Sequence, residues 1–181
     1  KVFDFSKSKE EFSFSDHRSD VKTCEWHPFE SLIVTGSKDC YVKVWDPRTG
    51  GKGVHTIPAH NNTITQTRWN PVNGNWFLTG SRDSKIKVYD LRKLDKEFNC
   101  FEGHDDPVNV VAWHPFKEDL FASATHAQKN GQIIYWNASL GSMLHKIDQA
   151  HDQMIWGMAW HPTGQLLATT SNDFKVRFWG V

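Results

Sequence analysis

Histidine, serine and aspartate recur together three times along the chain, and these residue types are those of a nucleophilic triad. In a triad the histidine takes the serine proton and the aspartate orients the imidazole. A catalytic site is normally built once, whereas these residues repeat. The repetition predicts a structural network that satisfies buried hydroxyl or indole groups. With the aromatic residue that follows each, the sets are His17, Ser37, Asp39 and Trp45; His60, Ser81, Asp83 and Tyr89; and His151, Ser171, Asp173 and Trp179.

A fourth copy departs from this pattern. His104, Thr125 and Trp136 take the places of histidine, serine and aromatic residue, but no aspartate follows. The turn is three residues longer and ends in Asn130-Gly131, a pair that favours positive φ. We therefore expect His104 to lack a carboxylate partner.

Nine tryptophans reveal the elements that must position these residues. Three series share spacings of 43 to 47 residues, namely the repeat histidines, the closing aromatics, and Trp26, Trp69, Trp113 and Trp160. Within one period, apolar and β-branched runs at 21–26, 32–36, 41–45 and 54–57 alternate with turn residues and predict four short strands. Four strands in such a period are typical of a β-propeller blade.

The repeat positions predict five segments. Residues 1–16 hold the last two strands of a preceding blade, and repeats follow at 17–59, 60–103, 104–150 and 151–181, the last without its outer strand. The alternative is that a strand at 10–15 completes the last blade, within the chain or in a dimer. Open blade edges favour self-association.

Composition narrows the function classes. The 181 residues carry 21 Lys and Arg against 21 Asp and Glu, so no global positive field holds a polyanion. Cys24, Cys40 and Cys100 match no metal-ligand spacing and are interpreted as reduced thiols. The chain shows no phosphate-binding glycine loop and no zinc motif. We expect a protein that is not an enzyme and uses no cofactor or metal.

The motifs resemble those of the WD-repeat family. The resemblance rests on the opening histidines (Gly103-His104 in full form), the Ser-x-Asp turns (Ser37-Lys38-Asp39, Ser81-Arg82-Asp83 and Ser171-Asn172-Asp173) and the closing Trp45-Asp46, Tyr89-Asp90 and Trp136-Asn137. It covers essentially the whole chain. It implies an all-β WD-repeat β-propeller, with four repeats forming an incomplete arc of a seven-bladed ring.

Segments 74–94, 111–123 and 154–179 look like the WD-repeat subunits of the pre-mRNA cleavage and polyadenylation factor. This resemblance implies a nuclear scaffold for mRNA processing that aids recognition of the poly(A) signal. The implied partners are a large propeller scaffold subunit, a CCCH zinc-finger subunit and, in the full complex, pre-mRNA. The alternative is a generic peptide-binding WD-repeat adaptor, such as a ubiquitin-ligase substrate receptor or a chromatin reader.

Candidate partner contacts follow from position in the repeat. Lys38, Arg82 and Asn172 precede the aspartate of each Ser-x-Asp turn, and Lys22 and Trp156 lie five residues after a repeat histidine. The residues equivalent to Trp156 are polar, so we expect this tryptophan to face solvent or the central channel.

Overall fold

The structure is a computed structural model that describes residues 1–49 and 53–180, and it is built of strands apart from the short 3-10 turn η1 (Pro47–Thr49). Each predicted strand run overlaps an observed strand. The strands are β1 (Val2–Asp4), β2 (Lys9–Phe12), β3 (Val21–Trp26), β4 (Ile33–Ser37), β5 (Tyr41–Trp45), β6 (Gly53–Pro58), β7 (Ile64–Trp69), β8 (Trp76–Ser81), β9 (Ile86–Asp90), β10 (Asn99–Phe101), β11 (Val108–Trp113), β12 (Leu120–Thr125), β13 (Gly131–Asn137), β14 (Ser142–His151), β15 (Ile155–Trp160), β16 (Leu166–Ser171) and β17 (Val176–Gly180).

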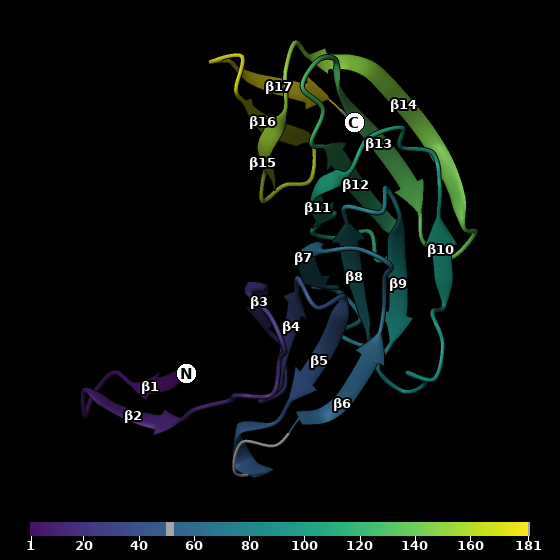
Figure 1. The fold of residues 1–181 in the computed structure, drawn as a ribbon. Helices are drawn as coiled ribbons and strands as arrows, with labels where there is room; N and C mark the ends of the chain where they lie inside the picture. The colour runs from purple at the N-terminus through teal and green to yellow at the C-terminus, as the bar shows by residue number, and fades with distance from the viewer. Residues whose placement is uncertain (50–52, 181) are drawn as a thin grey trace.

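These strands form antiparallel sheets in chain order. The sheets are β1-β2, β3-β4-β5-β6, β7-β8-β9-β10, β11-β12-β13-β14 and β15-β16-β17, and we call the last four the first to fourth blades. The first strands of successive blades pack against one another, β3 on β7, β7 on β11 and β11 on β15. Figure 1 shows the blades following one another along an arc. The predicted all-β fold, an incomplete arc of propeller blades, is confirmed.

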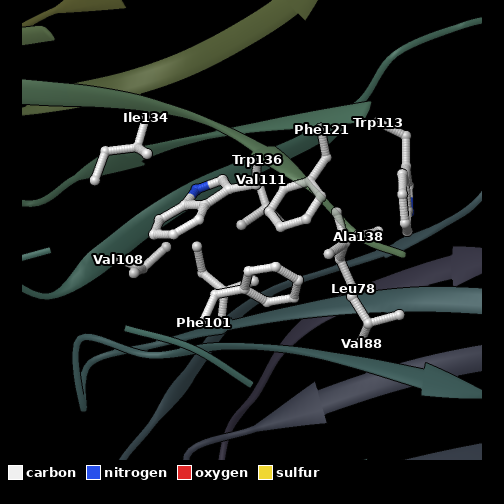
Figure 2. Close-up of a cluster of buried hydrophobic side chains, with 11 residues drawn as sticks. Leu78, Val88, Phe101, Val108, Val111, Trp113, Phe121, Ile134, Trp136 and Ala138 are labelled. Carbon is white, nitrogen blue, oxygen red and sulfur yellow. The ribbon is translucent and has the colours of Figure 1, made fainter. Parts of the chain in front are cut away.

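The hydrophobic core lies between neighbouring blades. Between the second and third, the cluster in Figure 2 contains Phe101, Trp113, Phe121 and Trp136, all at most 6% exposed. Phe101 meets Phe121 edge-to-face, with ring centroids 5.1 Å apart. Full burial of one such side chain is worth about 1.5–3 kcal/mol. Each blade is therefore stabilised mainly by its neighbours, as in other repeat architectures.

The turn between the second and third strands of each blade holds one residue in the left-handed region. Its φ is 72° at Cys40, 65° at Ser84, 59° at Asn130 and 64° at Phe174. The Asn130 value agrees with the positive φ expected for Asn130-Gly131. At Cys40, Ser84 and Phe174 this backbone conformation is sterically unfavourable, because the Cβ of an L-residue comes close to the following carbonyl oxygen.

The ends of the arc leave apolar side chains exposed. They include Val21 and Trp26 in the first blade, and Val176 and Phe178 in the fourth. β2 pairs with β1, at the end of the arc opposite to β17 (Figure 1), so a strand at 10–15 does not complete the last blade within the chain. No helix among the described residues is long and apolar enough to span a membrane.

Candidate functional site

In the first blade a chain of hydrogen bonds joins His17, Asp39, Thr35 and Trp45. The imidazole Nδ1 lies 2.9 Å from Asp39 Oδ2, and Nε2 lies 2.8 Å from Thr35 Oγ1. The indole Nε1 of Trp45 donates to the same threonine oxygen at 2.8 Å. One hydroxyl therefore links the imidazole to the indole.

The second blade repeats the chain with one change. His60 Nδ1 lies 2.9 Å from Asp83 Oδ2, and Nε2 lies 2.8 Å from Thr79 Oγ1. Tyr89 stands in place of the tryptophan, and its hydroxyl donates to the carbonyl of Ala59 at 3.4 Å. Thr79 Oγ1 therefore bonds to the imidazole of His60 and not to the aromatic residue Tyr89.

In the fourth blade His151 makes the equivalent contacts. Its Nδ1 lies 2.9 Å from Asp173 Oδ2 and its Nε2 2.8 Å from Thr169 Oγ1. Trp179 Nε1 donates to Thr169 at 2.9 Å. In the first and fourth blades the histidine, aspartate and tryptophan named from the sequence share one network, whereas Tyr89 of the second blade lies outside the chain that joins Asp83, His60 and Thr79.

The carboxylates fix the direction of the hydrogen bonds. Burial by itself would raise the pKa of Asp83, but hydrogen bonds and charge from His60 and two backbone N–H groups lower it to about 2. A carboxylate ionised at neutral pH can only accept, so His60 Nδ1 donates to Asp83. Thr79 Oγ1 lies 2.8 Å from His60 Nε2 and also donates to the carbonyl of Lys87 at 3.3 Å. Both groups are buried, so this imidazole and hydroxyl are withdrawn from any substrate.

The serines of the Ser-x-Asp turns lie outside these chains. Ser37 Oγ donates to the carbonyl of Ser19 at 3.2 Å and accepts from the backbone N–H of Asp39 at 3.1 Å. Ser81 and Ser171 make the same pair of contacts in their blades. The expectation that the serine joins histidine and aspartate was wrong. The network hydroxyl lies two residues earlier on the same strand face, at Thr35, Thr79, Ser123 and Thr169.

The third blade keeps only half of the network. His104 Nε2 lies 2.6 Å from Ser123 Oγ, which also accepts from Trp136 Nε1 at 2.7 Å. Nδ1 of His104 has no hydrogen-bond partner among the described residues. Burial lowers the pKa of His104 to about 4, although its interaction with Gln132 favours the charged form. Thr125, predicted as the network hydroxyl, accepts instead from the backbone N–H of Gln132 at 3.0 Å.

The other tryptophan series connects blades. The indole N–H groups of its last three members donate to first-strand carbonyls of the preceding blades, Trp69 to Glu25 at 3.3 Å, Trp113 to Arg68 at 3.0 Å and Trp160 to Ala112 at 3.2 Å. The spacing identified this series of tryptophans. No pattern within one repeat, however, predicts that the indole bonds to a carbonyl of the preceding repeat. The bond explains why tryptophan recurs here.

The turns between second and third strands place one row of side chains on a single face of the arc, called the turn face below. The row contains Lys38, Arg82, His126 and Asn172, whose backbone N–H groups make equivalent hydrogen bonds to Asp20, Thr63, Pro107 and Met154. His126 is the member that sequence reasoning missed, because the lengthened turn hides its register. Lys38 and Arg82 are exposed, and neither side chain has a hydrogen-bond or ion-pair partner among the described residues.

Trp156 lies on the turn face beside this row. Its side chain is 55% exposed, and its Nε1 donates to Asn172 Oδ1 at 2.7 Å. Its ring meets His126 edge-on, with centroids 5.8 Å apart and planes at 82°. Lys22 occupies the equivalent position in the first blade, where its Nζ donates to Asp20 Oδ2 at 3.4 Å. The structure therefore places these two predicted contact residues in different blades and does not bring them together.

Within the described residues, no group of three His, Cys, Asp or Glu side chains is placed to hold a metal ion. Cys24, Cys40 and Cys100 are free thiols. The arrangement offers buried structural networks on the one hand and the exposed turn face on the other.

Known proteins resemble this chain along nearly its whole length. It is 48% identical over 203 residues to polyadenylation factor subunit 2 of Neurospora crassa, covering 99% of this chain and 31% of the relative. The corresponding protein of Gibberella zeae is 44% identical over 205 residues, covering 99% and 33%. WD repeat-containing protein slp1 of Schizosaccharomyces pombe is 24% identical over 184 residues, covering 99% and 28%. The chain thus spans about a third of the length of these relatives.

The model of the nucleolar protein 10-like, N-terminal domain family, a β-propeller family, matches residues 4–179. This match includes all four blades and their polar networks. The chain therefore belongs to this β-propeller family, and its four repeats are WD repeats.

Proposed function

We propose that this chain is part of a non-enzymatic scaffold of the nuclear machinery that cleaves and polyadenylates pre-mRNA. The observation that carries this proposal is the identity of 44–48%, across nearly the whole chain, with two proteins named polyadenylation factor subunit 2. A WD-repeat propeller offers rigid faces to several partners at once. The scaffold organises the other protein subunits and aids recognition of the poly(A) signal by RNA-binding components.

The geometry supports a scaffold because the repeated polar residues are used internally while the turn face stays free. The proposed partner contacts on this face are Lys38, Arg82, Trp156 and Asn172, and Lys22 extends them along β3. The proposed partners are a large propeller scaffold subunit and a CCCH zinc-finger subunit. Pre-mRNA contact is proposed for the full complex.

The test is affinity purification of the tagged natural protein from nuclear extract, with co-purifying chains identified by mass spectrometry. We expect other polyadenylation subunits, and we expect less of them with the double variant Lys38→Glu, Arg82→Glu. Circular dichroism of each variant controls for folding. Recovery of ubiquitin-ligase or chromatin components instead would favour the generic adaptor and remove this proposal.

A further inference from the structure

The chain contains two asparagine–glycine pairs, and the fold holds them differently. They are Asn73-Gly74, in the loop between β7 and β8, and Asn130-Gly131, where the lengthened turn of the third blade enters β13. Such pairs are prone to deamidation, because glycine has no side chain to shield the backbone nitrogen from the asparagine carboxamide. Hydrogen bonds that hold either reacting group slow the reaction, since both groups must move before they can meet.

The first pair is held at both reacting groups. Asn73 Oδ1 accepts from the backbone N–H of Asn75 at 3.0 Å and from that of Trp76 at 3.2 Å. The backbone N–H of Gly74 donates to the carbonyl of Asn70 at 3.1 Å. Attack of this nitrogen on the Asn73 carboxamide would therefore break three hydrogen bonds.

The second pair is open. Asn130 is exposed, and its carboxamide makes no hydrogen bond among the described residues. Its backbone N–H alone is bonded, to the carbonyl of Asp152 at 3.3 Å. Gly131 is the first residue of β13, and the pairing with β14 shifts register immediately after it. The end of a strand opens more readily than its middle, so little restrains this nitrogen.

We propose that Asn130 is a site of spontaneous deamidation and that the fold protects Asn73 from the same reaction. The nitrogen of Gly131 gives up its proton and bonds to Cγ of Asn130. The bond from Cγ to Nδ2 breaks, and Nδ2 takes up the proton and leaves as ammonia. Water then opens the resulting succinimide ring at either carbonyl. The products are aspartate or isoaspartate at position 130, and the net reaction consumes one water and releases one ammonia.

The two products differ in their effect on the blades. Position 130 lies six residues before its closing aromatic residue, as Asp39, Asp83 and Asp173 do, so the repeat accommodates an aspartate there. Isoaspartate instead inserts a methylene group into the main chain where the third blade meets the fourth. A Cβ on Gly131 would collide with the carbonyl of Gln153, so the backbone has no room to shift toward the fourth blade. Isoaspartate therefore loosens this contact between blades.

The experiment ages the purified natural protein in mildly alkaline buffer. Peptide mapping by mass spectrometry follows the conversion of amide to acid at both pairs, and labelling by protein isoaspartyl methyltransferase measures isoaspartate. We expect Asn130 to react about tenfold faster than Asn73 or more, because the three hydrogen bonds at the first pair raise its barrier. In guanidinium chloride, where the fold is lost, most of this difference should disappear.

Variants assign the product and its effect. Asn130→Gln should abolish most of the isoaspartate, because the longer side chain closes a ring slowly, and the matched control Asn73→Gln should leave it unchanged. Asn130→Asp adds the negative charge without lengthening the main chain, so it should melt like the fresh natural protein. The aged natural protein should melt about 2 °C lower or more, and aged Asn130→Gln should not. Circular dichroism of fresh samples shows whether each variant is folded.

Three outcomes would overturn the inference. They are equal rates at the two pairs in the folded protein, no faster reaction of Asn130 than of Asn73 after prolonged ageing, and undiminished isoaspartate in Asn130→Gln. If Asn130 reacts as expected but the aged and fresh proteins melt at the same temperature, the loosening of the blade contact is refuted. A melting temperature of Asn130→Asp as low as that of the aged protein would assign the effect to charge and refute the role of isoaspartate.

Discussion

Replacing Ser123 by alanine tests whether the hydroxyl of the polar network, and not the conspicuous turn serine, holds each blade together. Ser123 Oγ is the shared partner of His104 Nε2 and Trp136 Nε1, and all three residues are buried. The substitution removes one oxygen and barely changes the volume. Its effect therefore reports the loss of hydrogen bonds and little else.

The magnitude follows from the number of groups left without a partner. A buried polar group without a hydrogen bond costs about 1–3 kcal/mol. Ser123→Ala orphans the indole N–H and the imidazole Nε2, so we expect a loss of about 4 kcal/mol. His104 Nδ1 already lacks a partner, so this ring cannot recover by exchanging tautomers.

The matched control is Ser171→Ala in the fourth blade. Ser171 Oγ contacts only the carbonyl of Gln153 and the N–H of Asp173, both at 3.2 Å, and the residue is half-buried, so water can replace the lost bonds. We expect it to cost about 1 kcal/mol. For a chain of this size 1 kcal/mol shifts the melting temperature by about 2–4 °C. Differential scanning calorimetry should separate the two variants by about 6–12 °C.

A double-mutant cycle with Trp136→Phe sharpens the assay. The phenylalanine has no N–H to orphan, so the serine and tryptophan changes together should cost about 1–2 kcal/mol less than the sum of the two. If Ser123→Ala destabilises no more than Ser171→Ala, or if the effects of the changes at Ser123 and Trp136 are additive, the shared hydroxyl does not stabilise the blade.

Other consequences of the structure are open to measurement. The pKa of Asp83 is about 2 when folded and near 3.8 when unfolded, so the bonds that its carboxylate accepts from His60, Asn61 and Lys85 together contribute about 1–2 kcal/mol above pH 4 after solvent screening, and this is lost as the pH falls toward 2. Asp83→Asn should flatten the acid side of a urea-unfolding series, and an unchanged slope would contradict the assignment. Phe174→Gly should raise the melting temperature by about 1–4 °C, because φ is 64° and the ring is 98% exposed; a decrease would point to an unrecognised contact of that ring. Trp113→Phe should lower the unfolding free energy by about 1–3 kcal/mol, measured by urea titration, since the Arg68 carbonyl loses its donor between blades; no loss would show that the indole bond is dispensable.

The repeat pattern alone was enough to predict the strands and their order. Residues equivalent to His60 and Tyr89 recur at spacings of 43 to 47 residues, and turn residues separate apolar runs of strand length. These are local properties of the chain, and a strand and its neighbour are joined by short turns. The comparison with known proteins then confirmed the WD-repeat interpretation.

The error at Ser37 shows where a local pattern stops being informative. Thr35 and Ser37 lie on the same face of β4, because side chains two residues apart in a strand point the same way. Both positions offered a hydroxyl to the imidazole. Only the folded blade shows that His17 reaches the middle of the strand and leaves its end to the turn.

What the sequence by itself determined is the blade, because its strands, turns and histidine–aspartate pairs follow from residues within one period. The partners that lie across blades were decided by the tertiary structure alone. Trp113 meets a carbonyl 45 residues earlier, and Trp156 meets His126 of the preceding blade. Such contacts depend on the angle and distance at which two sheets pack, and these are set by all the side chains between them and not by any motif.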